Sequence, residues 1–230
     1  MIRFAGLYHL VEVRRRFGVW AGLQSLVYGI CRRLLRLRVY HVVVAETTDA
    51  VTINDKSQSR FLAADEVRCF AEDPCNDLDK NIHRRLNSGK NFCLGTIFDG
   101  RLVSYSWFAV DSIEGEHACG SLISFPPKVA YFYKAFTLPK YRGLGIHQST
   151  LLQALRELHA HGIRQVFGLV EVNNLSSLKS CFHAGFRQTG RLIAVGRESS
   201  SWSWLTGQSK SLGICVGRNV ELKARGTRSS

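Results

Sequence analysis

An arginine and two glycines stand at the start of a helical pattern and could bind an anion. Arg142 is followed by Gly143 and Gly145, and leucines recur at helical spacing from Leu151 onward. Glycine has no Cβ atom, so the backbone can approach a ligand closely and turn its N–H groups toward one point. The first N–H groups of a helix have no partners within it. Together with the positive helix end and Arg142, they predict a cradle for a pyrophosphate. The structural alternative is an ordinary glycine-containing turn with an arginine on the surface.

The spacing around these glycines disfavours two other nucleotide-binding motifs. No Gly-Lys-Ser/Thr sequence follows them, as a P-loop requires. The GxGxxG pattern is missing, as is an early strand–turn–helix unit with an acidic residue about twenty positions downstream. Nucleotide hydrolysis and hydride transfer are therefore disfavoured.

Cysteine and histidine spacing gives no sign of disulfides or metal. The seven cysteines form neither a CxxC pair nor a regular pattern, which indicates reduced thiols in a cytoplasmic protein. The nearest histidine pair, His159 and His161, has no cysteine at ligand spacing, so no metal site is predicted.

The net charge of +13 lies mainly at the two ends of the chain. Residues 1–38 carry +7 and residues 218–230 carry +3, which leaves +3 for residues 39–217. A domain that reads nucleic acid with its folded surface usually carries a basic stripe there, so this pattern disfavours nucleic acid as a partner. We expect a basic helical extension (1–38), a folded domain (39–217) and a basic tail (218–230).

The extension has the periodicity of an amphipathic helix. Apolar residues recur at steps of three and four between Val19 and Leu37, with arginines on both sides. The uncharged run, Phe17 to Cys31, is 15 residues long, shorter than the roughly 20 that span a bilayer. One interpretation places the helix in the plane of an anionic membrane, such as the inner membrane face, with Trp20 near the headgroups. The alternatives are a helix packed on the domain or on a second subunit, as in a homodimer, and a targeting or disordered arm.

The rest of the chain alternates strand and helix patterns. Strands are predicted over 40–46, 121–128, 129–138, 164–172, 185–195 and 213–217, with a hairpin over 91–111 that turns at Asp99-Gly100. Helices are predicted over 63–73, from the glycine turn to Gly162, and over 174–184. Two successive strand–helix–strand units predict an α/β domain with a mixed sheet.

The segment 137–152 resembles the acetyl-CoA binding motif of the GCN5-related N-acetyltransferases (GNAT superfamily). The motif has an arginine or glutamine, two residues, glycine, one residue, and glycine or alanine, after a strand and a frequent proline. Pro139, Arg142 and Gly145 match it. The segment 171–190 resembles the second motif of the family, matched by the following residues: Asn174, Ser177, Gly185 and Phe186. The resemblance covers roughly residues 40–195.

The resemblance implies a splayed, mixed central sheet flanked by helices, with acetyl-CoA wedged between the strand before Pro139 and the strand 164–172. The pyrophosphate would lie on backbone N–H groups of Arg142, Gly143, Leu144, Gly145, Ile146 and His147. The pantetheine would pair with Phe136, Thr137 and Leu138, and Asn174 and Ser177 would contact it from the other side.

Two positions depart from the family pattern. His147 stands where glycine or alanine is usual, and we expect it to be tolerated or to contact phosphate. The family often has a tyrosine in the short helix that protonates the departing thiolate, and by spacing that position is Cys181. A thiol could donate a proton, but a buried structural cysteine is the alternative reading.

A general base is needed because an attacking amine is mostly protonated near neutral pH. Many family members use a glutamate on the strand before the phosphate turn, and Tyr131 occupies that position here. The remaining candidates are Glu171 on the strand 164–172, Tyr133, and the loop residues Glu114, Glu116 and His117.

The sequence thus predicts a cytoplasmic acyltransferase that moves an acetyl group from acetyl-CoA to a small-molecule acceptor. The default acceptor is a small amine or an amino sugar, attacked while both substrates are bound, and O-acylation is the variant reaction. The alternative from another class is a non-catalytic CoA-binding domain, attached to a membrane or to nucleic acid through its basic ends.

Overall fold

The computed structural model describes residues 11, 13–49, 58–78, 86–114, 122–196 and 202–217. The strands are β1 (Leu37–Glu46), β2 (Gln58–Phe61), β3 (Asn91–Phe98), β4 (Arg101–Val110), β5 (Ser112–Glu114), β6 (Leu122–Ser124), β7 (Val129–Thr137), β8 (Gln165–Glu171), β9 (Arg187–Val195), β10 (Trp202–Leu205) and β11 (Cys215–Gly217). The helices are α2 (Val19–Leu34), α3 (Ala64–Ala71), α5 (Ile146–Ala160) and α6 (Leu175–His183), with 3-10 turns η1 (Pro139–Tyr141) and η2 (Gly207–Leu212).

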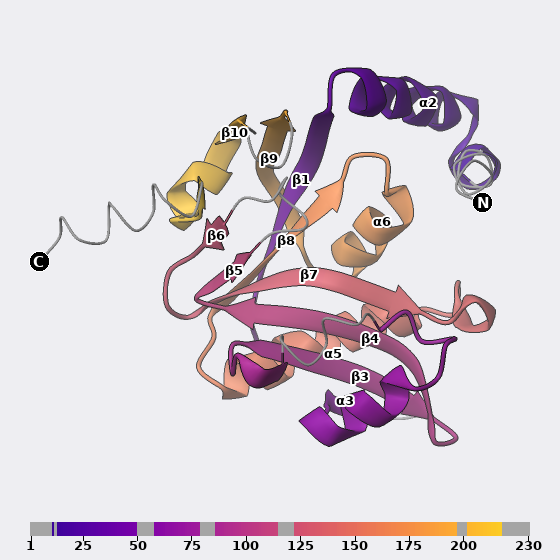
Figure 1. The fold of residues 1–230 in the computed structure, drawn as a ribbon, viewed down its shortest axis with the longest axis vertical. Helices are drawn as coiled ribbons and strands as arrows, with labels where there is room; N and C mark the ends of the chain where they lie inside the picture. The colour runs from indigo at the N-terminus through magenta and orange to yellow at the C-terminus, as the bar shows by residue number, and fades with distance from the viewer. Residues whose placement is uncertain are drawn as a thin grey trace, which may run out of the picture.

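The strands form one large mixed sheet and one small sheet (Figure 1). The large sheet has the order β10-β9-β1-β8-β7-β4-β3-β2, and the small sheet has the order β11-β6-β5. Only β7 and β8 pair in parallel among the described strands, and their crossover is α5. The predicted α/β fold with a mixed, splayed sheet is therefore confirmed.

The splay lies between β7 and β8. Their pairing runs from Val129 opposite Gln165 to Phe132 opposite Gly168. Within the described residues no pairing joins the two strands beyond that point, although β7 continues to Thr137 and β8 to Glu171. On their other sides β7 stays paired with β4 and β8 stays paired with β1, so the sheet opens only between β7 and β8.

A β-bulge marks the place where the strands diverge. Trp107 of β4 lies opposite Lys134, but the next residue, Phe108, lies opposite Phe132. Tyr133 is thus the extra residue on β7, and a bulge bends its strand and increases the local twist. The bend turns the second half of β7 away from β8.

Two apolar cores cover the two faces of the sheet. One is built around Leu151 and Leu155 of α5 together with Phe132, Cys181 and Phe186. The other is built around Tyr105, Trp107, Tyr131 and Phe167 and is closed by α3 and the small sheet. We call the first the helix face, because α5 and α6 pack on it, and the second the opposite face.

Local turn chemistry explains why several predicted boundaries are correct. Asp99 and Gly100 have φ values of 49° and 71°, which matches the left-handed turn expected for the β3–β4 hairpin. Gly162, with φ of 79°, follows the end of α5.

Some predictions were wrong or incomplete. The amphipathic helix does not reach Leu37, because Arg36 has φ of 52° and the chain enters β1 there. Strands β2, β5 and β10 were not predicted, since each is only three or four residues long. The predicted basic tail 218–230, Glu116 and His117 lie outside the described residues.

Candidate functional site

The segment predicted to form the anion cradle connects β7 through η1 to α5. Gly143 and Gly145 have φ values of 84° and 77°, and Gly145 caps the helix. The first backbone bond of α5 runs from Ser149 N–H to the Gly145 carbonyl, at 3.0 Å. Within the described chain, no carbonyl accepts a hydrogen bond from the N–H groups of residues 143–148. These N–H groups at a positive helix end can bind a pyrophosphate.

Arg142 is turned back toward the end of β7. Its Nε donates a hydrogen bond to the Thr137 carbonyl at 3.0 Å, and its guanidinium lies 5.9 Å from the centre of the Phe136 ring. The arginine therefore ties the cradle to the free end of the splayed strand. The sequence analysis placed the Arg142 backbone N–H at the anion, but this N–H donates to the Pro139 carbonyl at 3.2 Å. The side chain instead supplies the contact with Thr137.

The open edge of β7 offers backbone groups to a ligand. Leu138 N–H donates to the Val103 carbonyl, and the Phe136 carbonyl accepts from Ser104 Oγ, so both point toward β4. Backbone groups in an antiparallel pair alternate in direction along the strand. The backbone groups of Ala135 and Thr137 consequently point toward β8, on the open side of the splay. Of the predicted pantetheine contacts Phe136, Thr137 and Leu138, only Thr137 therefore directs its backbone groups to the opening. The Thr137 carbonyl shows this directly, because it accepts from Arg142.

Two helices border the opening on the helix face. Thr150 anchors α5 to the sheet through a buried hydroxyl–hydroxyl contact with Thr96 of 2.7 Å. Gln148, in the first turn of α5, donates to the His183 carbonyl at the end of α6, at 3.0 Å. The cradle and the predicted second motif are therefore joined by a direct hydrogen bond.

His147 points into the core rather than into the cradle. Its ring lies 6.1 Å from that of Phe132, the last residue of β7 paired to β8. Its Nδ1 is buried and has no hydrogen-bond partner within the described residues. Burial disfavours the charged imidazolium and lowers the pKa of His147 to about 4. The His147 side chain, which is larger than the glycine or alanine usual at this position in the family, is thus accommodated in the core. Its backbone N–H stays at the start of α5.

Three predicted site residues, Asn174, Ser177 and Cys181, lie in the short helix α6 or at its N-cap. Asn174 is its N-cap, and its side-chain oxygen accepts from the Ser177 N–H at 3.2 Å. Cys181 is fully buried in the helix-face core. Burial raises the pKa of the Cys181 thiol to about 12, so the proton is held firmly near neutral pH. This environment favours the structural reading of Cys181.

Three acid–base candidates of the large sheet lie on the opposite face: Tyr131 and Tyr133 belong to its core, and Glu171 lies opposite Tyr40 of the same core. Tyr131 is buried before the splay begins and stacks on Phe167, with ring centres 4.7 Å apart. Burial raises the pKa of Tyr131, so its phenol stays protonated near neutral pH and cannot act as a general base. Tyr133, at the bulge, donates its hydroxyl hydrogen to Asn91 Oδ1 at 3.0 Å. Glu171 ends β8, and Glu114 ends β5 in the small sheet.

Glu171 is held by a residue that sequence reasoning missed. Arg32 of α2 lies 3.1 Å from Oε1 and 3.2 Å from Oε2 of Glu171. Residue spacing in the sequence could not have predicted this pair, because the two residues are 139 positions apart. The contact of Tyr133 with Asn91 was missed for the same reason.

Among the described residues, no three His, Cys, Asp or Glu side chains gather as a metal site.

Comparison with known proteins found similar solved structures. No family model and no curated protein matches the chain. A solved structure described as a GNAT-family acetyltransferase from Novosphingobium aromaticivorans is 17% identical, with a TM-score of 0.49 over 70% of this chain and 64% of that chain. A GNAT-family acetyltransferase from Colwellia psychrerythraea is 14% identical, with a TM-score of 0.47 over 74% and 61%.

A third similar structure is the aminoglycoside acetyltransferase AAC(6')-Iy with a bisubstrate analogue of CoA. It is 14% identical, with a TM-score of 0.43 over 57% of this chain and 91% of that chain. The chain spans less than two thirds of the length of the first two structures.

Proposed function

We propose that the protein is an acetyltransferase of the GNAT type, which uses acetyl-CoA as its acyl donor. The observation that carries this proposal is the position of the cradle formed by the N–H groups of residues 143–148. It lies just beyond the end of β7, the strand that separates from β8 after Phe132. An anion-binding helix end beside an open strand edge suits a ligand that has a diphosphate at one end and an amide-containing arm beside it.

In this proposal different residues bind the diphosphate and the pantetheine arm of acetyl-CoA. The N–H groups at the start of α5 hold the diphosphate, and Arg142 keeps that loop against Thr137. Ala135 and Thr137 pair with the amides of the pantetheine arm as a strand neighbour would. Asn174 and Ser177 border the same arm from α6, where the Asn174 side chain is already fixed as a helix cap.

The proposed reaction is a direct transfer between two bound substrates. The acceptor nitrogen attacks the thioester carbonyl carbon, and the C–S bond breaks as the tetrahedral intermediate collapses. Backbone N–H groups of β7 stabilise the oxyanion. Glu171 takes the proton from the attacking amine, because it is the carboxylate at the end of the splayed strand, and Arg32 fixes its position. The thiolate is protonated from water or from the ammonium of the product.

The proposed acceptor is a small amine, such as an amino sugar, and a hydroxyl acceptor is the variant. Tyr133 and Glu171 lie on the opposite face of the sheet, the face without α5 and α6. An acceptor that uses them would therefore approach from the opposite face, while the diphosphate stays at the start of α5.

Calorimetry with CoA and acetyl-CoA tests the binding step. The Gly145→Ala variant places a Cβ at a positive φ, which distorts the cradle. Gly162→Ala is a matched control, since its φ of 79° is nearly that of Gly145 and no atom lies within 4 Å of either new Cβ. We expect similar losses of stability, on the order of 1 kcal/mol, but weaker CoA binding only for Gly145→Ala. Equal affinity in the two variants would contradict the cradle.

Release of free CoA thiol with a panel of amines and hydroxyl compounds tests the chemistry. Thiol release that depends on one acceptor class supports the enzyme and names its substrate class. Tight CoA binding without release for any acceptor would instead support the alternative, a non-catalytic CoA-binding domain.

A further inference from the structure

Helix α2 is turned with its apolar side away from the domain. Figure 1 shows it at the margin of the molecule, beyond the start of β1. The less exposed residues of α2 are small or polar, namely Ala21, Gly22, Ser25, Tyr28 and Cys31. Ser25 is only 6% exposed, and the Tyr28 hydroxyl accepts from Val39 N–H at 3.0 Å. This orientation is the reverse of an ordinary surface helix, which buries its apolar stripe.

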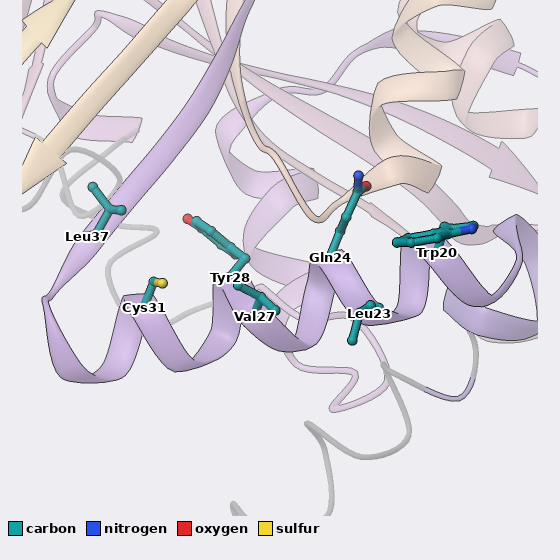
Figure 2. Close-up of a pocket in the computed structure, with 7 residues that line it drawn as sticks. All are labelled: Trp20, Leu23, Gln24, Val27, Tyr28, Cys31 and Leu37. Carbon is teal, nitrogen blue, oxygen red and sulfur yellow. The ribbon is translucent and has the colours of Figure 1, made fainter.

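The apolar side of α2 remains in solvent along the whole helix. Trp20 is 77% exposed and Leu34 is 75% exposed. The other large apolar side chains that are exposed on α2 are Val19, Leu23, Leu26, Val27 and Ile30. In Figure 2, Tyr28 points from the helix toward the domain, whereas Leu23 and Val27 point to the other side.

A shallow apolar pocket continues this surface toward β1. It is lined by Trp20, Leu23, Gln24, Val27, Tyr28, Cys31 and Leu37 (Figure 2). We call the exposed apolar residues of α2 and this pocket the α2 surface. Contiguous exposed apolar surface of this kind marks an interaction site rather than random scatter.

Charge indicates what the α2 surface binds. Residues 13–38 contain seven arginines and no acidic residue. Arg33 and Arg36 are exposed at the end of α2, next to the apolar side chains. A partner that suits this combination is negatively charged at its surface and apolar just beneath it. An anionic phospholipid bilayer has that profile.

A second copy of the chain suits the same surface less well. Two α2 surfaces facing each other would bring their arginines together, and the Glu171 carboxylate at the end of β8 is already paired with Arg32. Like charges brought together at an interface oppose association.

The helix is too short to cross a bilayer. Its 16 residues span about 24 Å at 1.5 Å per residue, against about 30 Å of hydrocarbon. Among the described residues no helix has the length and apolar character that a membrane crossing requires. A bound α2 would therefore lie in the plane of the membrane.

We propose that α2 docks the protein in-plane on an anionic phospholipid surface. Its apolar residues enter the headgroup–acyl boundary, with Trp20 at the level of the headgroups. Arg33 and Arg36 contact the lipid phosphates. This inference does not depend on acyl transfer, because it rests on α2 alone.

Vesicle sedimentation of the full chain tests the proposal. We expect binding to phosphatidylcholine vesicles that contain phosphatidylglycerol, weaker binding to pure phosphatidylcholine, and release by rising sodium chloride. The double variant Arg33→Gln/Arg36→Gln should lose about fivefold in affinity per arginine, the factor equivalent to about 1 kcal/mol. Arg101→Gln, an exposed arginine on the β3–β4 hairpin, should bind like the wild type.

A variant that replaces two apolar residues of α2 distinguishes insertion into the membrane from attraction by charge alone. Trp20→Gln/Leu23→Gln should weaken binding at least about tenfold, since the apolar burial of two side chains is lost. Trp202→Gln is the matched control, because Trp202 is 74% exposed on β10, in the large sheet. Both apolar sites are exposed, so thermal unfolding should change little in either variant.

Sedimentation equilibrium decides between lipid and a second copy. A monomeric wild type that binds anionic vesicles supports the proposal. A dimer that Trp20→Gln/Leu23→Gln converts to monomer, with no vesicle binding, would assign the α2 surface to self-association and overturn it. Equal binding to neutral and anionic vesicles would also overturn it.

Discussion

Arg32 of α2 and Glu171 at the end of β8 form an ion pair of 3.1 Å between Nη1 and Oε1. The pair connects the helix with the exposed apolar side to the strand that borders the splay. Side chains of both residues are partly exposed, so the bond contributes at most about 1 kcal/mol to stability. Its main effect is to fix the position of the Glu171 carboxylate.

This pair predicts separate effects on activity and stability. Glu171→Gln removes the proposed base and should lower kcat by roughly 10² to 10⁴-fold. Arg32→Gln leaves the carboxylate in place but unrestrained, so we expect a smaller loss of kcat with an unchanged KM for acetyl-CoA. Steady-state kinetics measure both effects, and urea unfolding checks that the free energy of unfolding changes by less than about 1 kcal/mol. If Glu171→Gln keeps wild-type kcat, another group takes the proton.

The bond from Arg142 to the Thr137 carbonyl gives a second prediction. Arg142→Leu removes the tie between the cradle and β7, and a hydrogen bond from a charged group contributes about 1.5–3 kcal/mol. We expect CoA affinity to fall by roughly tenfold or more in calorimetry. The control is Lys140→Leu, two residues earlier, whose Nζ lies 5.0 Å from the centre of the Tyr141 ring. A similar loss in both variants would indicate a general charge effect instead.

The fold could be predicted wherever local chemistry determines it. The Asp99-Gly100 turn, the helix from the glycine turn to Gly162 and the cap at Asn174 all depend on residues close together in sequence. The glycine turn at the start of α5 was predictable for the same reason, since its glycines and its helix are consecutive, and its role as an anion cradle stays a prediction.

Contacts between distant segments could not be predicted. The orientation of α2 depends on Tyr28 meeting Val39 and on Arg32 meeting Glu171, and periodicity alone does not say which side of a helix faces the domain. An apolar stripe ordinarily faces inward, so the sequence pattern favoured packing. The inward turn of His147 likewise follows from the space beside Phe132, which is set by the register of β7 and β8.

Gly190 of β9 predicts a steric effect on the far side of the sheet. A Cβ at this position would lie 1.9 Å from the Thr206 carbonyl oxygen, which belongs to the backbone before η2. Gly190→Ala must therefore separate β9 from the segment 206–212, and we expect a loss of roughly 1–3 kcal/mol. Urea unfolding measures this loss.

Gly29→Ala is the control for Gly190→Ala. Gly29 lies in α2, and a Cβ added there would have no atom within 4 Å, so alanine should stabilise the helix by up to about 1 kcal/mol. Opposite signs for the two variants are expected. A neutral Gly190→Ala would show that the 206–212 segment is not held against β9.

His147 predicts how stability depends on pH. Its pKa is about 4 in the folded protein, against 6.5 for an exposed histidine. Between these values the unfolded chain binds a proton that the folded chain does not bind, so the free energy of unfolding rises with pH in this window. The part of the free energy of unfolding that depends on His147 protonation is fully present above pH 6.5. It is lost as the pH falls toward 4, by roughly 3 kcal/mol in total.

The difference between wild type and His147→Leu isolates this effect, because carboxylates that titrate in the same window are common to both. Urea midpoints measured at several pH values should show a shallower loss on acidification for His147→Leu. Since the imidazole is the only group changed, equal slopes for wild type and His147→Leu would mean that water reaches Nδ1 and that the ring is not held against Phe132.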